Sequence, residues 1–182
     1  MSIDKVQLRS QIRASRDAFV AGRPPALEAP PEYHALLKAG LTVASYVPVG
    51  SEADPSRLAR AAVEAGCVIA LPHVTIRAEP MRFLSWATEA ALVAGPFGLQ
   101  QPAADAAALV PDIILTPLLA FDSKLDRLGQ GAGYYDRAFA EFPNARRIGV
   151  AWNVQCVDGL PVDPWDMPLD AVITESGWIT AL

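Results

Sequence analysis

The chain has 182 residues, of which 52% are hydrophobic. This length predicts one domain, spanning residues 1–182, because most domains contain about 100–200 residues. Twenty Asp and Glu residues against fifteen Lys and Arg residues give a net charge of −5, which argues against a general nucleic-acid or anionic-membrane binder, since both need a basic surface.

The N-terminus and the cysteines indicate the cellular setting. Charged residues begin at Asp4, no apolar signal core follows, and no stretch reaches about 18 uninterrupted apolar residues. We therefore expect a cytoplasmic protein with no membrane span. Cys67 lies in the apolar run 67–71, which favours a buried free thiol over a disulfide with Cys156.

The first predicted element is an amphipathic helix over residues 3–20. Leu8, Ile12 and Phe19 fall on one face. A basic stripe on another face is spaced by four, four and three residues and consists of Lys5, Arg9, Arg13 and Arg16. Such a stripe is usually a solvated face, but at this spacing it could also grip a triphosphate.

Strands and further helices alternate along the rest of the chain. The segments with strand character are residues 41–47, 68–71, 81–86, 112–116, 147–151 and 171–174. Helices are expected over residues 31–39, 55–65 and 133–142. Asp54 and Pro55 have the character of a helix start, and Pro72 is expected to end the second strand.

This alternation predicts the fold class. Strands alternating with helices indicate an α/β fold with three layers, α/β/α, around a mostly parallel central sheet. In such sheets ligands bind beyond the carboxyl ends of the strands.

A glycine-rich loop follows the strand at 112–116 after a short extension. Gly129, Gly131 and Gly133 alternate, and glycine permits a positive φ and close backbone approach. We call residues 129–133 the glycine loop. Successive N–H groups in such a loop can converge on one anion, and the following helix adds the positive end of its dipole. Arg127 and Asp136 flank the loop with a cation and a metal-binding carboxylate, the groups that phosphoryl transfer requires.

The standard nucleotide-binding motifs do not fit this segment. Gly-x-x-x-x-Gly-Lys-Ser/Thr is absent, and Gly-x-Gly-x-x-Gly fails because residue 134 is tyrosine. On these residues alone, a phosphate-binding loop and a flexible turn, in which Asp136 serves only the helix dipole, are equally well supported.

A series of short motifs runs in order through nearly the whole chain. The longest is the segment 121–137, Phe-Asp-Ser-Lys-Leu-Asp-Arg-Leu-Gly-Gln-Gly-Ala-Gly-Tyr-Tyr-Asp-Arg. The others are Lys5-x-x-x-Arg9, Tyr46-x-Pro48 with Glu52, Leu71-Pro72, Met81-x-Phe83, Phe97-Gly-Leu-Gln-Gln-Pro102, Gln155, Leu160-Pro161, Pro164-Trp-Asp-Met-Pro168 and Ile173-Thr174. Together they resemble the 5-formyltetrahydrofolate cyclo-ligase family, also called 5,10-methenyltetrahydrofolate synthetase.

The resemblance implies a ligase of one-carbon metabolism that depends on ATP and Mg²⁺. Such an enzyme converts 5-formyltetrahydrofolate and ATP into 5,10-methenyltetrahydrofolate, ADP and phosphate. A formamide oxygen is a poor leaving group, so the formyl oxygen would first be phosphorylated, after which folate N10 would attack the activated carbon. The protein mainly has to hold two reactants in line and neutralise phosphate charge. Folate and ATP are then its partners, and we expect a monomer.

The resemblance also implies roles for individual residues. ATP binding falls on Lys5, Arg9, Arg127, Leu128, Gly129, Gln130, Gly131, Ala132, Gly133, Tyr134 and Tyr135. Folate binding falls on Val47, Glu52, Met81, Phe83, Phe97, Gln130, Gly131, Ala132, Gly133 and Tyr134. Asp136 and Asp166 would ligate Mg²⁺, and Arg127, Tyr134 and Asp136 would act in catalysis.

Some assignments have a simpler interpretation beside the functional one. Met81 and Phe83 alternate on a predicted strand, which is typical of plain core, and Asp166 could cap a turn. Ala132 stands where the family often carries a basic or glycine residue, so one phosphate contact would be missing. Arg13 or Arg16 could compensate for it.

Two alternative functions fit the same sequence. One is a sugar-phosphate isomerase or acyl-transfer enzyme on a related scaffold, which would not need the pair Asp136 and Asp166 or the pair Lys5 and Arg9. The other is a non-catalytic module that binds folate or a nucleotide, which only a turnover measurement separates from an enzyme.

Overall fold

The structure is a computed structural model that describes residues 5–181, so the start of the first predicted helix at residue 3 lies outside the described residues. The helices are α1 (Lys5–Ala21), α2 (Pro31–Leu36), α3 (Ser56–Glu64) and α4 (Tyr134–Glu141), with short 3-10 turns η1 (Pro96–Gly98) and η2 (Asn153–Gln155). The strands are β1 (Thr42–Ala44), β2 (Val68–His73), β3 (Arg82–Ser85), β4 (Val93–Ala94), β5 (Gln100–Gln101), β6 (Ile113–Pro117), β7 (Ala120–Phe121), β8 (Arg127–Leu128), β9 (Arg146–Val150), β10 (Ala171–Thr174) and β11 (Gly177–Ile179).

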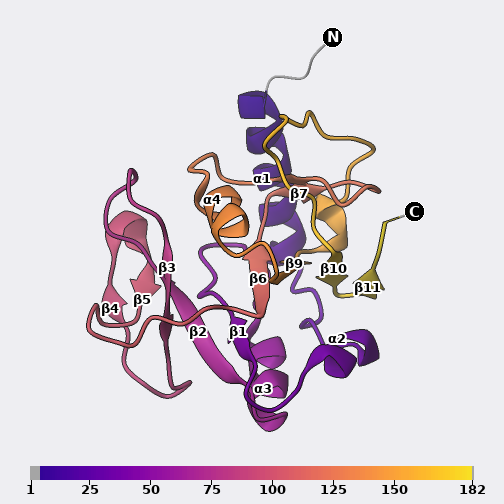
Figure 1. The fold of residues 1–182 in the computed structure, drawn as a ribbon. Helices are drawn as coiled ribbons and strands as arrows, with labels where there is room; N and C mark the ends of the chain where they lie inside the picture. The colour runs from indigo at the N-terminus through magenta and orange to yellow at the C-terminus, as the bar shows by residue number, and fades with distance from the viewer. Residues whose placement is uncertain (1–4, 182) are drawn as a thin grey trace.

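A seven-stranded sheet runs through the described part of the chain in the order β11-β10-β9-β6-β1-β2-β3 (Figure 1). The strands from β10 to β2 pair in parallel, and the edge strands β3 and β11 are antiparallel to their neighbours. The predicted α/β fold with a mostly parallel sheet is therefore confirmed. The short hairpins β4–β5 and β7–β8 and the edge strand β11 were not predicted.

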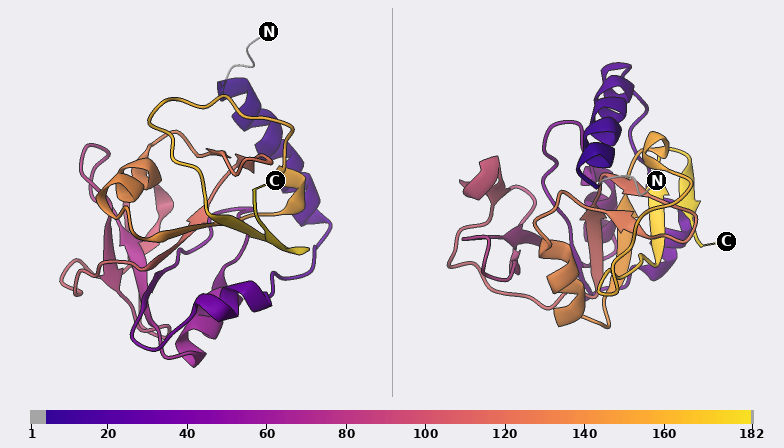
Figure 2. Two further views of the ribbon diagram at one scale, coloured as in Figure 1. Left: turned by 45° about the vertical axis from the view of Figure 1, so that its right-hand side comes forward. Right: turned by 90° about the horizontal axis from the view of Figure 1, so that it is seen from above.

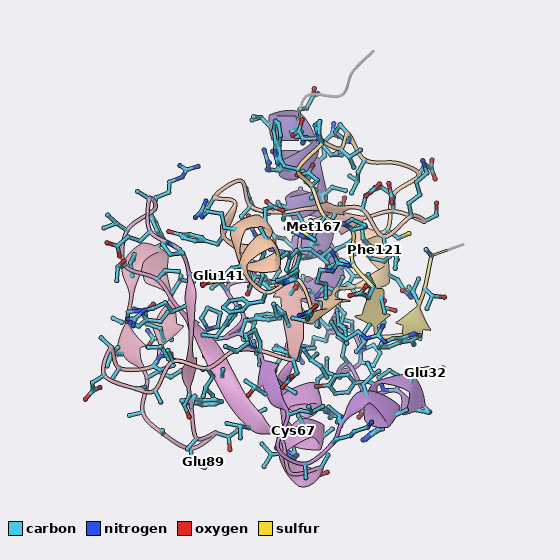
Figure 3. The ribbon with its side chains drawn as sticks, viewed as in Figure 1. Glu32, Cys67, Glu89, Phe121, Glu141 and Met167 are labelled. Atoms are coloured by element: carbon cyan, nitrogen blue, oxygen red, sulfur yellow. The ribbon has the colours of Figure 1, made fainter. Side chains whose placement is uncertain are left out.

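Helices cover both faces of this sheet, which gives the three predicted layers. Successive residues of the inner strands, such as Val43 and Ala44, point to opposite faces and enter different core clusters. One cluster packs against α2 and α3, and the other packs against α4. Figure 2 shows α2 and α3 on one side of the sheet and α4 on the other. Phe121 and Met167, labelled in Figure 3, pack in the α4 layer.

The prediction that Pro72 ends the second strand is wrong, because β2 continues to His73. Within β2, the Ala70 carbonyl accepts a bond from Ser45 N on the β1 side of the strand. Pro72 faces that same side, where β1 has already ended at Ala44. Its missing N–H therefore costs no ladder bond, and the strand continues by pairing with β3.

Helix α1 lies across the carboxyl ends of the parallel strands. Its residues Leu8 and Ile12 are buried against β7 and β8. Its Arg16 side chain is also buried, and it donates from Nε to Ser51 Oγ at 2.9 Å and from Nη1 to the Leu118 carbonyl at 3.5 Å. The basic stripe is thereby turned toward the edge of the sheet where ligands usually bind.

Two smaller expectations can also be compared with the structure. Cys67 is a buried free thiol, as predicted (Figure 3). Asp54 accepts a bond from Ser56 N at 2.9 Å. Helix α3 begins at Ser56, one residue later than the predicted first helical residue, Pro55. Among residues 5–181, the helices are too short or too polar to cross a membrane.

The buried carboxylate of Asp122 joins two segments that lie next to the glycine loop. Its Oδ1 accepts bonds from Lys124 N and Asp126 N, which shape the turn between β7 and β8. Its Oδ2 accepts a bond from Leu160 N at 3.0 Å and so holds the segment 157–166 beside that turn.

Replacing Asp122 by alanine should therefore destabilise the fold. We expect the free energy of unfolding to fall by about 2–4 kcal/mol, because hydrogen bonds to a charged group each contribute roughly 1.5–3 kcal/mol. Urea unfolding followed by circular dichroism measures this loss. Asp105 is exposed and is the matched control. A loss no larger than that of Asp105→Ala would contradict the role of Asp122.

Candidate functional site

A cavity of about 840 Å³ opens at the carboxyl ends of the parallel strands. Six segments line it: α1, the loop after β1, the end of β2 with the turn to β3, the region around η1 and β5, the segment from β8 through the glycine loop to the start of α4, and residues 163–166. The predicted site residues that line this cavity are Lys5, Arg9, Val47, Glu52, Met81, Phe97, Arg127, Leu128, Gly129, Gln130, Gly131, Ala132, Gly133, Tyr134, Tyr135, Asp136 and Asp166. Residues from both ends of the chain are thus brought together.

Phe83 is the predicted site residue that does not line this cavity. Its ring is 1% exposed and packs against Phe142, with ring centroids 5.8 Å apart. Phe83 therefore has the core position that the alternating pattern indicated, whereas Met81, two residues earlier, is buried and still lines the cavity.

The glycine loop connects β8 to α4. Gly131 and Gly133 have φ values of 99° and 70°, in the left-handed region that glycine adopts without strain. Gly129 does not need this region, but a Cβ there would lie 3.2 Å from Arg127 Nη1. Two of the three glycines are therefore required by backbone conformation, and the third by the close approach of a side chain.

An ion pair between Arg127 and Asp136 joins the two ends of the glycine loop. The Arg127 side chain is 6% exposed, and its guanidinium lies 4.9 Å from the centre of the Phe139 ring. Burial lowers the pKa of Arg127, and Asp136 followed by Asp166 acts in the opposite direction. Within the described residues its Nε has no hydrogen-bond partner. The result is a fixed cation with one donor unused.

Lys5 enters the cavity from α1 and is held by two carboxylates. Its Nζ lies 2.6 Å from Asp163 Oδ2 and 3.6 Å from Asp166 Oδ2. The hydrogen bond that Lys5 donates to Asp163 is the main reason that the pKa of Lys5 is raised. Asp166 Oδ2 also accepts a bond from Asp163 N at 2.8 Å, so it caps a turn and lines the cavity as well.

Glu52 lies on another wall of the cavity, and its carboxylate is largely shielded from water. Its Oε2 accepts a bond from Val49 N at 3.0 Å. Burial raises the pKa of Glu52, while the Val49 N–H, Arg16 and Gln130 favour the charged form. A half-buried carboxylate of this kind can accept hydrogen bonds from a polar ligand.

An apolar wall adjoins Glu52 and includes Val47, Met81 and Phe97. Phe97 is 70% exposed and has a φ of 59°, a conformation that is uncommon for a large side chain and that tends to occur at functional sites. These side chains offer apolar contacts to a ring.

Several cavity residues were missed from the sequence. Asp163 binds Lys5, and Trp165 is 70% exposed at the cavity edge. Trp165 lies in the motif 164–168, where the carboxylate of Asp166 drew attention instead, and no local pattern distinguishes Asp163 from an ordinary loop residue. Arg13 and Arg16 were named as possible replacements for a loop cation. Arg13 Nη2 donates to Gln130 Oε1 at 2.8 Å, whereas Arg16 is engaged with Ser51.

Asp136 and Asp166 fit one kind of metal site only. No group of three or more His, Cys, Asp or Glu side chains suited to a metal occurs among residues 5–181. Each of the two carboxylates has a cation beside it, Arg127 and Lys5 respectively. Mg²⁺ usually takes one or two protein carboxylates and completes its shell with phosphate oxygens and water. The donor set therefore fits an ion that arrives with a phosphorylated ligand.

Comparison with known proteins identifies the relatives of this chain. The model of the 5-formyltetrahydrofolate cyclo-ligase family matches residues 2–175. The 5-formyltetrahydrofolate cyclo-ligase of Escherichia coli K12 is 34% identical over 142 residues, covering 74% of this chain and 78% of that protein. The enzyme of the same name from Mycolicibacterium smegmatis is 35% identical over 154 residues, covering 79% of this chain and 78% of that protein.

Two solved structures resemble the fold along nearly its whole length. The 5,10-methenyltetrahydrofolate synthetase of Aquifex aeolicus has a TM-score of 0.69 at 26% identity, covering 97% of this chain and 92% of that one. The Mycoplasma pneumoniae protein of the same name also has a TM-score of 0.69, at 25% identity, covering 94% of this chain and 98% of that one.

The raised pKa of Glu52 predicts a cost in stability at neutral pH. In the unfolded chain the Glu52 carboxyl has a pKa of 4.5, and the folded state binds its proton more tightly. The free energy of unfolding therefore falls as the pH rises from 4.5 through the higher pKa of the folded state. Glu52→Gln should therefore raise the urea midpoint at about pH 7 and change it little at about pH 4. Exposed Glu64 provides the control variant Glu64→Gln. Equal midpoints for Glu52→Gln and the unmodified chain at both pH values would contradict this cost.

Proposed function

Because the chain belongs to the 5-formyltetrahydrofolate cyclo-ligase family, and so is a carbon–nitrogen bond-forming ligase of folate metabolism, we propose that it uses ATP and Mg²⁺ to cyclise 5-formyltetrahydrofolate to 5,10-methenyltetrahydrofolate, as a single domain. The observation that carries this proposal is one cavity lined by two unlike groups of residues. The glycine loop and Arg127 offer hydrogen-bond donors and positive charge, and Glu52 with Val47, Met81 and Phe97 offers an acceptor and apolar contact.

The cationic group suits the phosphates of ATP. Arg9 donates from Nε to the Gly129 carbonyl at 2.9 Å, so its guanidinium lies directly beside the glycine loop. With Lys5, Arg127 and the loop N–H groups of residues 129–135, it forms a donor-rich surface for a polyphosphate. Positioning and charge neutralisation are the main tasks of a protein in phosphoryl transfer.

The other group suits the folate. Glu52 would accept hydrogen bonds from the N–H groups of the pterin, and Val47, Met81 and Phe97 would pack against its flat ring. Gln130 and Tyr134 line the cavity from the loop and would contact the folate near the phosphate-binding side.

Asp136 and Asp166 would hold Mg²⁺, which would neutralise part of the phosphate charge. Both carboxylates line the cavity with Lys5 and Arg127. Lys5 and Arg127 lie beside these carboxylates and would contact phosphate oxygens of the same ligand. In the absence of a ligand, the ion pairs Lys5–Asp166 and Arg127–Asp136 would hold these side chains at the cavity.

The reaction itself needs the formyl oxygen in line with the γ-phosphate. Attack of that oxygen on phosphorus releases ADP and gives a phosphorylated iminium carbon, which N10 then attacks as phosphate leaves with the former formyl oxygen. Arg127, with an unused Nε donor, would stabilise charge on the transferring group. The Tyr134 hydroxyl is buried and has no partner within the described residues, so it could donate to the formyl or phosphate oxygen.

Turnover tests the proposal directly. Purified protein with Mg²⁺ and ATP should convert 5-formyltetrahydrofolate into the methenyl product, which is followed by its ultraviolet absorbance. Asp136→Asn should lower kcat by at least about 100-fold, as expected when a group that stabilises transferring charge is lost. Glu141→Gln alters an exposed residue at the far end of the same helix (Figure 3) and should leave kcat unchanged.

The result for the unmodified chain decides between enzyme and binding module. Product formation supports the proposal, whereas a folded sample that binds both ligands and forms no product would indicate a non-catalytic module. Full activity of Asp136→Asn would remove Asp136 from the metal and catalytic roles.

Lys5 should contribute to ATP affinity. Lys5→Ala removes one cation from the phosphate side, and we expect about a three- to tenfold weaker affinity, because a hydrogen bond to a charged group contributes roughly 1.5 kcal/mol or less when it is partly exposed. Calorimetric titration with ATP measures the change. Lys38→Ala, at an exposed position outside the cavity, is the control. Unchanged affinity in Lys5→Ala would exclude Lys5 from the site.

A further inference from the structure

Three arginines from three different elements bind the backbone carbonyls of the glycine loop. Arg9 of α1 donates to the Gly129 carbonyl at 2.9 Å. Arg77, in the turn between β2 and β3, donates from Nη2 to the Gly131 carbonyl at 3.0 Å. Arg137 of α4 donates from Nη1 to the Ala132 carbonyl at 3.2 Å. A loop whose own residues carry no cation is thus surrounded by cations.

Arg77 and Arg137 differ from Arg9 in their position relative to the cavity. Arg9 lines the main cavity, and the other two do not. Arg77 instead lines a small depression of about 230 Å³ together with Phe97, Gln130, Gly131 and Ala132. Those four residues also line the main cavity, so the depression that contains Arg77 adjoins the cavity at the glycine loop.

The direction of these carbonyls determines where the neighbouring N–H groups point. A trans peptide is planar, so the C=O of one residue and the N–H of the next point in opposite directions. With the Gly131 and Ala132 carbonyls directed to Arg77 and Arg137, the N–H groups of Ala132 and Gly133 point away from these arginines. That is the orientation which an anion in the main cavity requires.

Other contacts hold the Arg77 turn against the loop. Arg137 Nη2 donates to the Arg77 carbonyl at 3.3 Å, and the Arg137 guanidinium lies 5.0 Å from the centre of the Tyr134 ring. Thr75 bonds to Glu79 across the turn. Among residues 5–181, no carboxylate forms a salt bridge with Arg77 or Arg137, so their charges are not offset by an ion pair.

We propose that Arg77 is a positioning residue of the phosphate-binding loop, which fixes the Gly131 peptide so that the N–H of Ala132 is directed to a bound polyphosphate. The inference rests on the proposed function, because it assigns the glycine loop to ATP. It adds a residue outside the cavity, on the turn between β2 and β3, and explains how a loop with alanine at position 132 keeps a phosphate-binding conformation.

Kinetics with the variant Arg77→Ala tests this role. The KM for ATP should rise about five- to tenfold, the effect expected from losing one charge-assisted hydrogen bond at an exposed position, with little change in the KM for 5-formyltetrahydrofolate. Arg77→Lys keeps a charged donor of similar length and should recover most of the affinity. Arg60→Ala removes an exposed arginine of α3 that has no contact with the loop and should leave both KM values unchanged.

A measurement without nucleotide separates positioning from direct contact with phosphate. In the ligand-free protein, the backbone amide resonances of Ala132 and Gly133 should shift in Arg77→Ala and return toward their original positions in Arg77→Lys. Amide resonances that stay in place in Arg77→Ala would overturn the positioning role.

The failure of this inference can be told apart from that of the proposed function. Titration with a non-hydrolysable ATP analogue should show binding to the unmodified chain and weaker binding to Arg77→Ala. Equal affinities would overturn the role of Arg77 alone. Absence of binding to the unmodified chain would overturn both this role and the assignment of the loop to ATP.

Discussion

The ion pair between Arg127 and Asp136 is the interaction on which the site depends. It connects the strand before the glycine loop to the helix after it, and so fixes the distance that the loop has to span. A buried guanidinium without a carboxylate would be strongly destabilising, so the pair also explains why Asp136 occupies the first turn of α4. The same carboxylate is proposed to receive Mg²⁺.

The surroundings of the glycine loop are basic although the chain as a whole is acidic. The net charge is −5, yet five arginines bind or flank the glycine loop, namely Arg9, Arg13, Arg77, Arg127 and Arg137. An acidic surface elsewhere limits non-specific binding to nucleic acid, while the local cations serve a phosphorylated small molecule. Glu52 and the exposed ring of Phe97 line the same cavity, where they offer a hydrogen-bond acceptor and an apolar contact beside the cations.

Much of the fold and part of the site could be predicted from the sequence, because the signals are local. The helical spacing of the basic stripe on α1, the apolar strand segments and the alternating glycines each involve neighbouring residues. The short strands β4, β5, β7, β8 and β11 were not predicted, since two or three residues carry too little periodicity to be recognised.

The sequence by itself determined the α/β class, the alternating glycines and the basic stripe, and its ordered motifs determined the family resemblance. Only the tertiary structure decided which of these residues meet. Arg77 and Gly131 lie 54 residues apart, and Lys5 and Asp163 lie 158 residues apart; no local pattern contains such pairs. The same limit explains Phe83, because an alternating strand shows that one face is apolar but not whether that face meets a cavity or the core. The apolar face of a strand or helix follows from neighbouring residues, whereas the residues that this face contacts depend on how the strands assemble into the sheet.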